Sequence, residues 1–253
     1  MDWSDLDPVE RSAAMTLLWR AAESRREDRL FADPVAEQAA AALPPWPPSA
    51  ASQVFADLVA LRSWQMDAQV ETALAAGLDQ IVVLGAGVDT RFWRVPPPAS
   101  ATIIELDSDA IHDFARQLLP GDGPGRRLGG RIPGGLARAL ARAAHDPYRP
   151  TLWIAEGLLE YLPGRLWDRL ARILTEHSAP ESRALITVLG ETLPEHFAYD
   201  PTFPFPRLPP LARILSAIPE GWEIDVLPAT VLRAVPPDAF LILSMRRAEP
   251  LPS

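Results

Sequence analysis

The chain of 253 residues contains no cysteine, no lysine and no asparagine. Without cysteine it can form no disulfide bond, use no thiol in catalysis and build no zinc–thiolate site. All 24 cationic residues are therefore arginines, so no lysine is available for a Schiff base or for anchoring pyridoxal phosphate. These absences exclude two classes of covalent catalysis.

Long apolar runs and an excess of positive charge are also missing. No apolar stretch reaches the about 18–20 residues that a membrane span requires, and residues 1–5 are acidic, unlike a secretory signal. The formal net charge is −9, and the arginines form only short clusters, which argues against a nucleic-acid partner. We therefore expect a cytoplasmic protein with a small-molecule substrate and no membrane or nucleic-acid partner. The oligomeric state is not predicted.

The hydrophobic pattern changes near residue 77. Before it, the sequence predicts three helices, over residues 7–28, 34–42 and 50–76. After it, short β-branched runs begin, the first being Ile81–Leu84, which is typical of a fully buried strand. We therefore divide the chain into an N-terminal helical cap, residues 1–76, and a core, residues 77–253.

Strands and helices alternate in the core, which indicates a parallel sheet covered on both faces. A further strand is expected in the Gly-rich segment 121–135, and the last two strands have no helix between them, as in an antiparallel hairpin. The predicted fold is a doubly wound, Rossmann-like α/β sheet of seven strands, one of them antiparallel. The other strands are expected over residues 81–84, 101–106, 152–155, 184–189, 222–227 and 239–245, and the helices over 108–119, 136–144 and 163–177.

The first strand runs into Gly85-Ala86-Gly87, a turn at which the backbone can approach a ligand closely. Such a turn serves dinucleotides and S-adenosylmethionine alike. A dinucleotide site requires a third glycine three residues on, and Thr90 stands there, which weakens that interpretation. Without further context, the turn could also be an ordinary strand-to-helix connection.

Two carboxylates close the second strand. Asp107 follows Gly85 by about 20 residues, the spacing at which an acidic residue accepts hydrogen bonds from ribose hydroxyls. Glu105 lies two residues earlier and therefore on the same face of the strand. The alternative is that both are solvated carboxylates at a strand end.

The sequence resembles the leucine carboxyl methyltransferase family, including its bacterial members that methylate polyketide-type metabolites. The most specific part of the resemblance is the string Gly85-Ala86-Gly87-Val88-Asp89-Thr90-Arg91 with Arg94. Further matches occur in the order and at the spacing of the family, over roughly residues 7–190 and more loosely over the tail. They are 20–24, 29–34, Arg62 with Asp67, 105–107, 155–162 and 221–222.

The resemblance implies a class I methyltransferase that uses S-adenosylmethionine, with Arg62 on the carboxylate of its methionine part, as suits a planar guanidinium. Asp107 would hold the ribose, and Glu156 would meet the ammonium group of the cofactor or the substrate; its alternative is a helix N-terminal acid. With the strand-end carboxylates, the candidate cofactor-binding residues are Arg62, Gly85, Ala86, Gly87, Glu105, Asp107 and Glu156. No metal site is predicted.

One departure from the family concerns the adenine. Relatives usually carry an Asp-Leu pair after the third strand, where the Asp accepts a hydrogen bond from the adenine amino group. Residues 127–132 of this chain read Arg-Leu-Gly-Gly-Arg-Ile and lack that carboxylate. The cofactor could be bound more weakly, be read by backbone groups, or have been abandoned.

An aromatic lid is expected over residues 190–210, and it contains the candidate catalytic residues His196 and Tyr199. Either could serve as a general base for a hydroxyl acceptor, whereas a carboxylate acceptor needs no base. His112, His145 and His177 fall on or beside predicted helices without metal-ligand spacing and are expected at the surface.

The predicted function is O-methylation of a carboxyl or hydroxyl group of a small, polyketide-type metabolite. Two alternatives remain open: an enzyme of this fold that catalyses a cyclisation or elimination without methyl transfer, and a binding or regulatory protein without turnover.

Overall fold

The computed structural model describes residues 2–44, 50–121, 123–190, 210–230, 232, 235–236 and 238–248. The N-terminal helices are α1 (Pro8–Ser24), α2 (Pro34–Ala40) and α3 (Ala50–Ala75), preceded by a 3-10 turn, η1 (Trp3–Asp5). Helix α1 begins where Asp7 and Glu10 cap each other's backbone N–H groups, and α2 begins where Asp33 accepts from the N–H of Ala36. The three predicted N-terminal helices are confirmed, with ends shifted by up to four residues.

Seven strands form a single sheet in the described part of the chain, in the order β3-β2-β1-β4-β5-β7-β6. Strand β7 pairs antiparallel with both β5 and β6, while β1 to β5 are mutually parallel. The doubly wound sheet with its antiparallel hairpin is confirmed, including the strand expected in the Gly-rich segment. The strands are β1 (Gln80–Leu84), β2 (Thr102–Asp107), β3 (Arg126–Gly129), β4 (Thr151–Ala155), β5 (Arg183–Leu189), β6 (Trp222–Pro228) and β7 (Phe240–Arg247).

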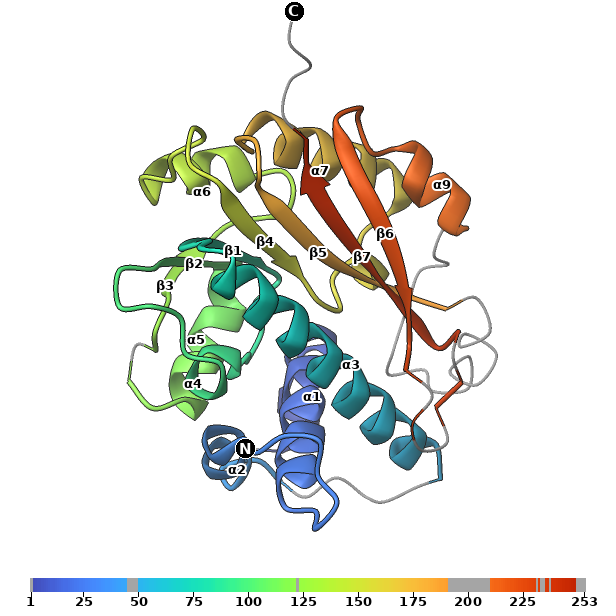
Figure 1. The fold of residues 1–253 in the computed structure, drawn as a ribbon. Coiled ribbons are helices and arrows are strands. Elements are labelled where there is room, and N and C mark those ends of the chain that lie inside the picture. The colour runs from blue at the N-terminus through green and yellow to red at the C-terminus, as the bar shows by residue number, and fades with distance from the viewer. Residues whose placement is uncertain are drawn as a thin grey trace, which may run out of the picture.

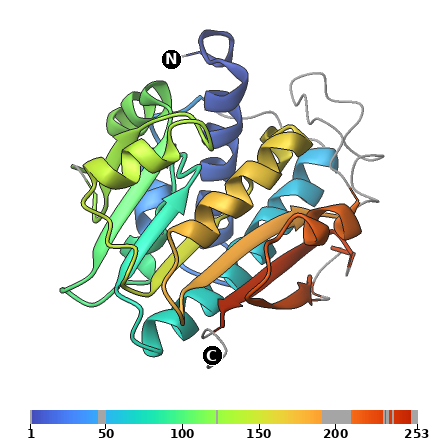
Figure 2. The same ribbon diagram turned by 90° about the horizontal axis from the view of Figure 1, so that it is seen from above.

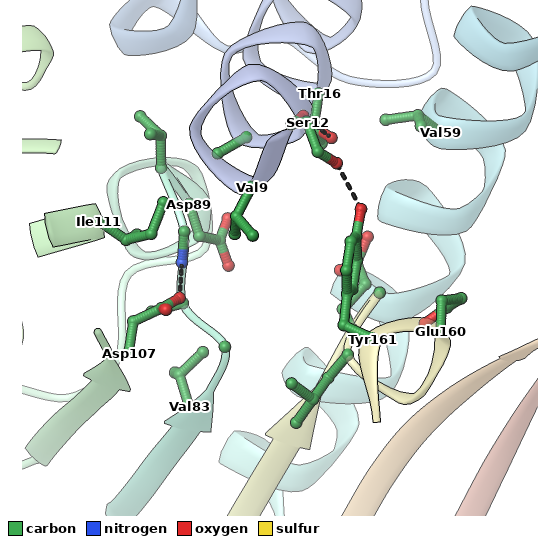
Figure 3. Close-up of a pocket in the computed structure, with 18 of the residues that line it drawn as sticks. Val9, Ser12, Thr16, Val59, Val83, Asp89, Asp107, Ile111, Glu160 and Tyr161 are labelled. Atoms are coloured by element: carbon green, nitrogen blue, oxygen red, sulfur yellow. Dashed lines mark hydrogen bonds between the residues drawn. The ribbon is translucent and has the colours of Figure 1, made fainter. Parts of the chain in front are cut away.

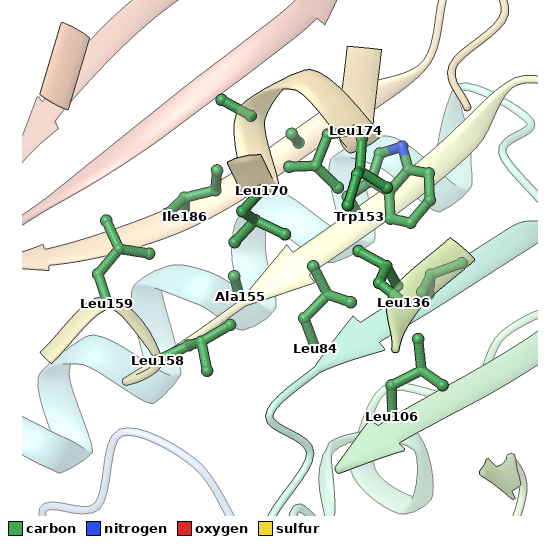
Figure 4. Close-up of a cluster of buried hydrophobic side chains, with 14 of the residues drawn as sticks. Leu84, Leu106, Leu136, Trp153, Ala155, Leu158, Leu159, Leu170, Leu174 and Ile186 are labelled. Atoms are coloured by element: carbon green, nitrogen blue, oxygen red, sulfur yellow. The ribbon is translucent and has the colours of Figure 1, made fainter. Parts of the chain in front are cut away.

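Helices cover both faces of the sheet, which is why every residue of β1 and β4 is buried (Figures 1 and 2). One face packs in a leucine-rich layer against helices α6 (Leu136–Arg142), α7 (Gly164–Glu176) and α9 (Leu211–Ser216), as Figure 4 shows around Trp153. The other face packs against α1, α3 and the short α4 (Arg91–Arg94). Helix α5 (Asp109–Leu118) joins α1 and α2 in a third apolar cluster.

Helices α1 and α3 share their apolar core with the sheet. Met15 and Trp19 of α1, and Leu58 of α3, belong to one buried cluster with Ile81 and Val83 of β1. In Figure 1, α1 and α2 lie beyond the carboxyl ends of the parallel strands, and α3 crosses in front of them. The cap therefore lies over the edge where open α/β sheets bind their ligands. No helix in the described ranges is long and apolar enough to cross a bilayer.

Candidate functional site

A cavity of about 570 Å³ opens at the carboxyl ends of β1, β2, β3 and β4. The strand order reverses direction between β1 and β4, and such a switch point is the usual ligand site of doubly wound sheets. One wall comes from the loops that follow these strands, and the other from α1 and α3 (Figure 3). The volume lies within the range of small-molecule sites, about 300–1,000 Å³.

The glycine turn after β1 forms the floor of the cavity. Gly85 and Gly87 have φ angles of +69° and +54°, and a Cβ at Gly85 would lie 3.0 Å from Cδ1 of Leu158. The N–H of Gly87 donates to Oδ2 of Asp107 over 2.9 Å, and the N–H of Ser108 donates to Oδ1 over 2.7 Å. Burial raises the pKa of Asp107, although these two N–H groups oppose the shift. The structure thus brings Gly85, Ala86, Gly87 and Asp107 together at one wall.

Glu105 is placed elsewhere. Its carboxylate accepts from Nε of Arg127 over 2.9 Å and does not line the cavity with Asp107. A Cβ at Gly125 would lie 2.7 Å from Oε1 of Glu105, so the glycine makes room for this carboxylate under the β2–β3 edge. Burial raises the pKa of Glu105, and Arg127 opposes that shift. That Glu105 joins Asp107 in binding the cofactor stays a prediction; in this structure Glu105 is paired with Arg127.

Arg62 and Glu156 face each other across the cavity. Nε of Arg62, from α3, donates to Oε1 of Glu156 over 3.0 Å, and the hydroxyl of Ser63 also contacts that oxygen at 3.3 Å. Gly157 has a φ of +64°, which favours glycine, and a Cβ there would lie 3.3 Å from Nη2 of Arg62, a tight contact. Because its hydrogen bond within the described residues uses Nε, Arg62 keeps Nη1 and Nη2 available to a ligand carboxylate.

Glu156 is also held by Arg91, which donates to its Oε2 through Nη2. Burial disfavours the charge of Glu156, but Arg91 and Arg62 outweigh that cost and hold its pKa well below its usual range. Arg91 in turn donates to Asp67 at 2.7 Å and to Asp89 at 3.0 Å. Arg91 thus links Glu156 to Asp67 of α3 and to Asp89 after the glycine turn.

The charges beneath the cavity form one balanced network. Arg94 joins Asp67 to Asp33 with contacts of 2.6 and 3.0 Å, and Arg20 of α1 donates to the carbonyl of Val88 and lies 3.8 Å from Asp89. Its members are four arginines and four carboxylates: Arg20, Arg62, Arg91 and Arg94 with Asp33, Asp67, Asp89 and Glu156. Each of these eight charges thus has an opposite partner, as burial requires.

The loop after β3 supplies the end of the cavity beyond Asp107. Gly130, Arg131 and Ile132 line it, together with Ile111 of α5. A Cβ at Gly129 would lie 1.7 Å from Oδ1 of Asp109, so a larger residue there would displace that side chain. Asp109 itself does not line the cavity.

Two functional candidates lie outside the described residues. These are His196 and Tyr199, together with nearly all of the expected lid.

The other histidines were expected at the surface, which is wrong for His112 and His145, 1 % and 8 % exposed. Sequence periodicity missed this because each ring is buried by a contact outside its own helix, at Leu128 or Thr151. The described residues contain no cluster of potential metal ligands.

The short 3-10 helix η2 (Leu159–Tyr161) adds residues for which the sequence gave no role. The hydroxyl of Tyr161 shares a 2.6 Å hydrogen bond with Ser12 of α1, which bridges the cap and the sheet (Figure 3). Burial raises the pKa of Tyr161. Glu160 lines the cavity beside it. Residues 155–162 match the family, but the sequence of this segment does not indicate which of its side chains line the cavity.

Comparisons with solved structures bear on the fold alone. A methyltransferase from Thermobifida fusca matches with a TM-score of 0.56 at 19 % identity, covering 93 % of this chain and 94 % of that one. A protein of Streptomyces avermitilis from the DUF574 family matches with a TM-score of 0.59 at 16 % identity, covering 94 % and 97 %. The expected class I methyltransferase fold is thereby confirmed.

Curated sequence relatives have a higher identity to this chain than these solved structures do. A protein of Mycobacteroides abscessus, named as an S-adenosyl-L-methionine-dependent methyltransferase, is 32 % identical over 74 % of this chain and 67 % of its own length. One of Streptomyces coelicolor with the same name is 34 % identical over 78 % of this chain and 75 % of its own length. The model of the leucine carboxyl methyltransferase family matches residues 13–175. This match covers more than half of the chain and both walls of the cavity, and the chain therefore belongs to the leucine carboxyl methyltransferase family.

Proposed function

We propose that this protein transfers a methyl group from S-adenosylmethionine to an oxygen atom of a small metabolite. The observation that carries the proposal is the pairing of two groups in one cavity. They are the glycine turn braced by Asp107, and the Arg62 fork with two free donors. The names of the relatives support the same cofactor.

The residues present fit this cofactor. Arg62 would grip the methionine carboxylate through Nη1 and Nη2, and Glu156 would face the ammonium group. Asp107 keeps acceptor capacity for ribose hydroxyls beyond its two N–H contacts, because each carboxylate oxygen can accept more than one hydrogen bond. Ile111 and the backbone of residues 130–132 would contact the adenine. These roles are proposals for Arg62, Gly85, Ala86, Gly87, Asp107 and Glu156.

When bound, the cofactor supplies an electrophilic methyl group on a positively charged sulfur. The protein then has three tasks: to align the acceptor with that methyl group, to exclude water, and to remove a proton where the acceptor carries one. The ion pairs of Glu156 with Arg62 and Arg91 hold these side chains in position at the cavity wall.

The acceptor is proposed to be a small, largely apolar molecule with a carboxyl or hydroxyl group, of the polyketide type. Apolar side chains of α1 and α3, such as Trp19, Phe55 and Val59, line the cavity on the side of the cap. The net charge of −9 disfavours nucleic acid. We further propose a cytoplasmic location, with His196 and Tyr199 contacting the acceptor from segment 191–209.

The test is incubation with methyl-labelled S-adenosylmethionine and an extract of the producing cell, followed by separation of products by size. Label in small molecules would support the proposal. Label only in protein or nucleic acid would overturn the acceptor class. Cofactor binding with no transfer to any fraction would favour a reaction without methyl transfer, or a binding protein.

A further inference from the structure

Glu160 is a buried carboxyl group to which no other residue in the described part of the chain donates a hydrogen bond. Its side chain is 1 % exposed, and neither Oε1 nor Oε2 has a partner among the described residues. It lines the cavity from η2, the turn that follows Glu156 (Figure 3). Burial raises the pKa of Glu160. The positive charge of Arg62 and the backbone N–H of Glu160 itself oppose the shift, and the negative charge of Glu156 adds to it.

The surrounding charges do not account for this carboxyl group. The balanced network of four arginines and four carboxylates is complete without it. The nearest cation, Arg62, is bonded through Nε to Glu156. A buried carboxyl group without a partner weakens a fold, and an apolar side chain would serve packing better. The cost is explained if a ligand group completes the pairing.

We propose that Glu160 accepts the proton of the methyl acceptor, and that the accepting group is therefore the hydroxyl of a phenol or an alcohol. This inference rests on the proposed function and narrows it. A hydroxyl would donate the hydrogen bond that the orphaned carboxylate lacks. An ionised carboxylate would instead bring a further negative charge beside Glu160 and Glu156, within an apolar wall where repulsion is strong.

The proton balance follows from the same geometry. As the acceptor oxygen forms its bond to the methyl carbon, the O–H bond breaks and its proton passes to a carboxylate oxygen of Glu160. The electron pair of the methyl–sulfur bond remains on sulfur, which becomes neutral. The proton on Glu160 then leaves to water when the product departs. A carboxyl group whose pKa is raised by burial suits this task better than one with an ordinary pKa, because its carboxylate is the stronger base.

A binding experiment tests the inference without turnover. The probes are 2-naphthol and 2-naphthoate, which share one apolar skeleton, titrated calorimetrically in the presence of S-adenosylhomocysteine. The wild type should bind 2-naphthol at least tenfold more tightly at pH 7, and Glu160→Gln should narrow the ratio to threefold or less. Glu71→Gln, at an exposed position of α3, should keep the wild-type ratio. A wild type that prefers 2-naphthoate, or an unchanged ratio in Glu160→Gln, would overturn the inference.

The second test reads the product and the rate. A methyl group on a hydroxyl is an ether and survives mild alkali, whereas a methyl ester releases methanol. Alkali-stable label is expected, with a rate at least 100-fold lower in Glu160→Gln and S-adenosylmethionine affinity changed less than threefold. Release of methanol, or full activity in Glu160→Gln, would contradict the role of Glu160. A wild type that binds no S-adenosylmethionine would instead refute the proposed function. The titration of S-adenosylmethionine therefore separates failure of the proposed function from failure of the role of Glu160.

A third variant separates catalysis from folding. Glu160→Leu replaces the carboxyl group with an apolar side chain of similar size, so its melting temperature should equal or exceed that of the wild type while the preference for 2-naphthol is lost. Strong destabilisation of Glu160→Leu would show that the carboxyl group supports the fold instead.

Discussion

Arg62 and Glu156 lie 94 residues apart in sequence and form a 3.0 Å hydrogen bond across the cavity. The first belongs to α3 of the cap and the second follows β4, so the contact joins the two walls. Arg91 holds Glu156 from the other side, and Gly157 leaves the space in which the guanidinium of Arg62 lies. The pair thus sets the direction in which Nη1 and Nη2 of Arg62 present their protons to a ligand.

Arg62→Lys should weaken S-adenosylmethionine binding about tenfold, because a point charge cannot both bond Glu156 and grip a carboxylate in bidentate fashion. Calorimetry measures the change. Arg169→Lys, on the exposed surface of α7, serves as the control. Equal affinity in Arg62→Lys and the control would exclude Arg62 from the site.

Asp107→Ala should cost about 1.5–3 kcal/mol of cofactor binding, the range for hydrogen bonds to a charged group. Asp107→Asn should lose less, since its side-chain oxygen can still accept from the N–H of Gly87. The control is Asp225→Ala, at an exposed position of β6. Unchanged affinity in Asp107→Ala would show that the carboxylate only braces the glycine turn.

Glu156→Gln should lower the free energy of unfolding by about 3–5 kcal/mol, since it leaves Arg62 and Arg91 buried beside a neutral group. Glu223→Gln breaks an exposed pair with Arg246 and should cost less than about 1 kcal/mol. Urea unfolding at pH 7 compares the two. The folded-state pKa of Glu156 is lowered, so its contribution is present above the unfolded pKa and is lost as the pH falls. A cost for Glu156→Gln no larger than that for Glu223→Gln would contradict the account of the network.

His145 should make the fold sensitive to acid. Burial, with a further contribution from His177, lowers the pKa of His145 from 6.5 to about 4. Its stabilisation is therefore present above pH 6.5 and is lost as the pH falls toward 4. Between pH 7 and pH 4 the wild type should lose about 2–3 kcal/mol more than His145→Gln, whose amide can still bond Thr151. Parallel losses measured by urea unfolding in the two proteins would refute this.

The sheet was predictable because most of its strands have a clear local hydrophobic pattern. Buried runs such as Ile81–Leu84 require cover on both faces, and the hairpin at the end follows from two strands without a helix between them. Strand β3 was hard to place because Arg126–Gly129 carries only one buried apolar residue. Its position depends on pairing with β2, which local pattern does not encode.

The site, like the sheet, contains residues whose place follows from local sequence and residues whose place depends on tertiary contacts. The glycine turn and Asp107 could be predicted because fixed spacing after a strand determines where they lie. The pairing of Glu105 with Arg127 could not be predicted, because alternation gives the face of a strand but not the partner that a neighbouring strand supplies. Glu160 was missed because no local pattern in residues 155–162 indicates which side chains of η2 line the cavity.

Titration of S-adenosylmethionine into the wild-type protein, followed by calorimetry and by native mass spectrometry, tests the central claim most directly. The cavity at the carboxyl edge, with Arg62 and Asp107 on opposite walls, predicts one cofactor per chain and a matching mass increment. A protein that releases no heat and gains no mass would contradict the assignment of this cavity to S-adenosylmethionine.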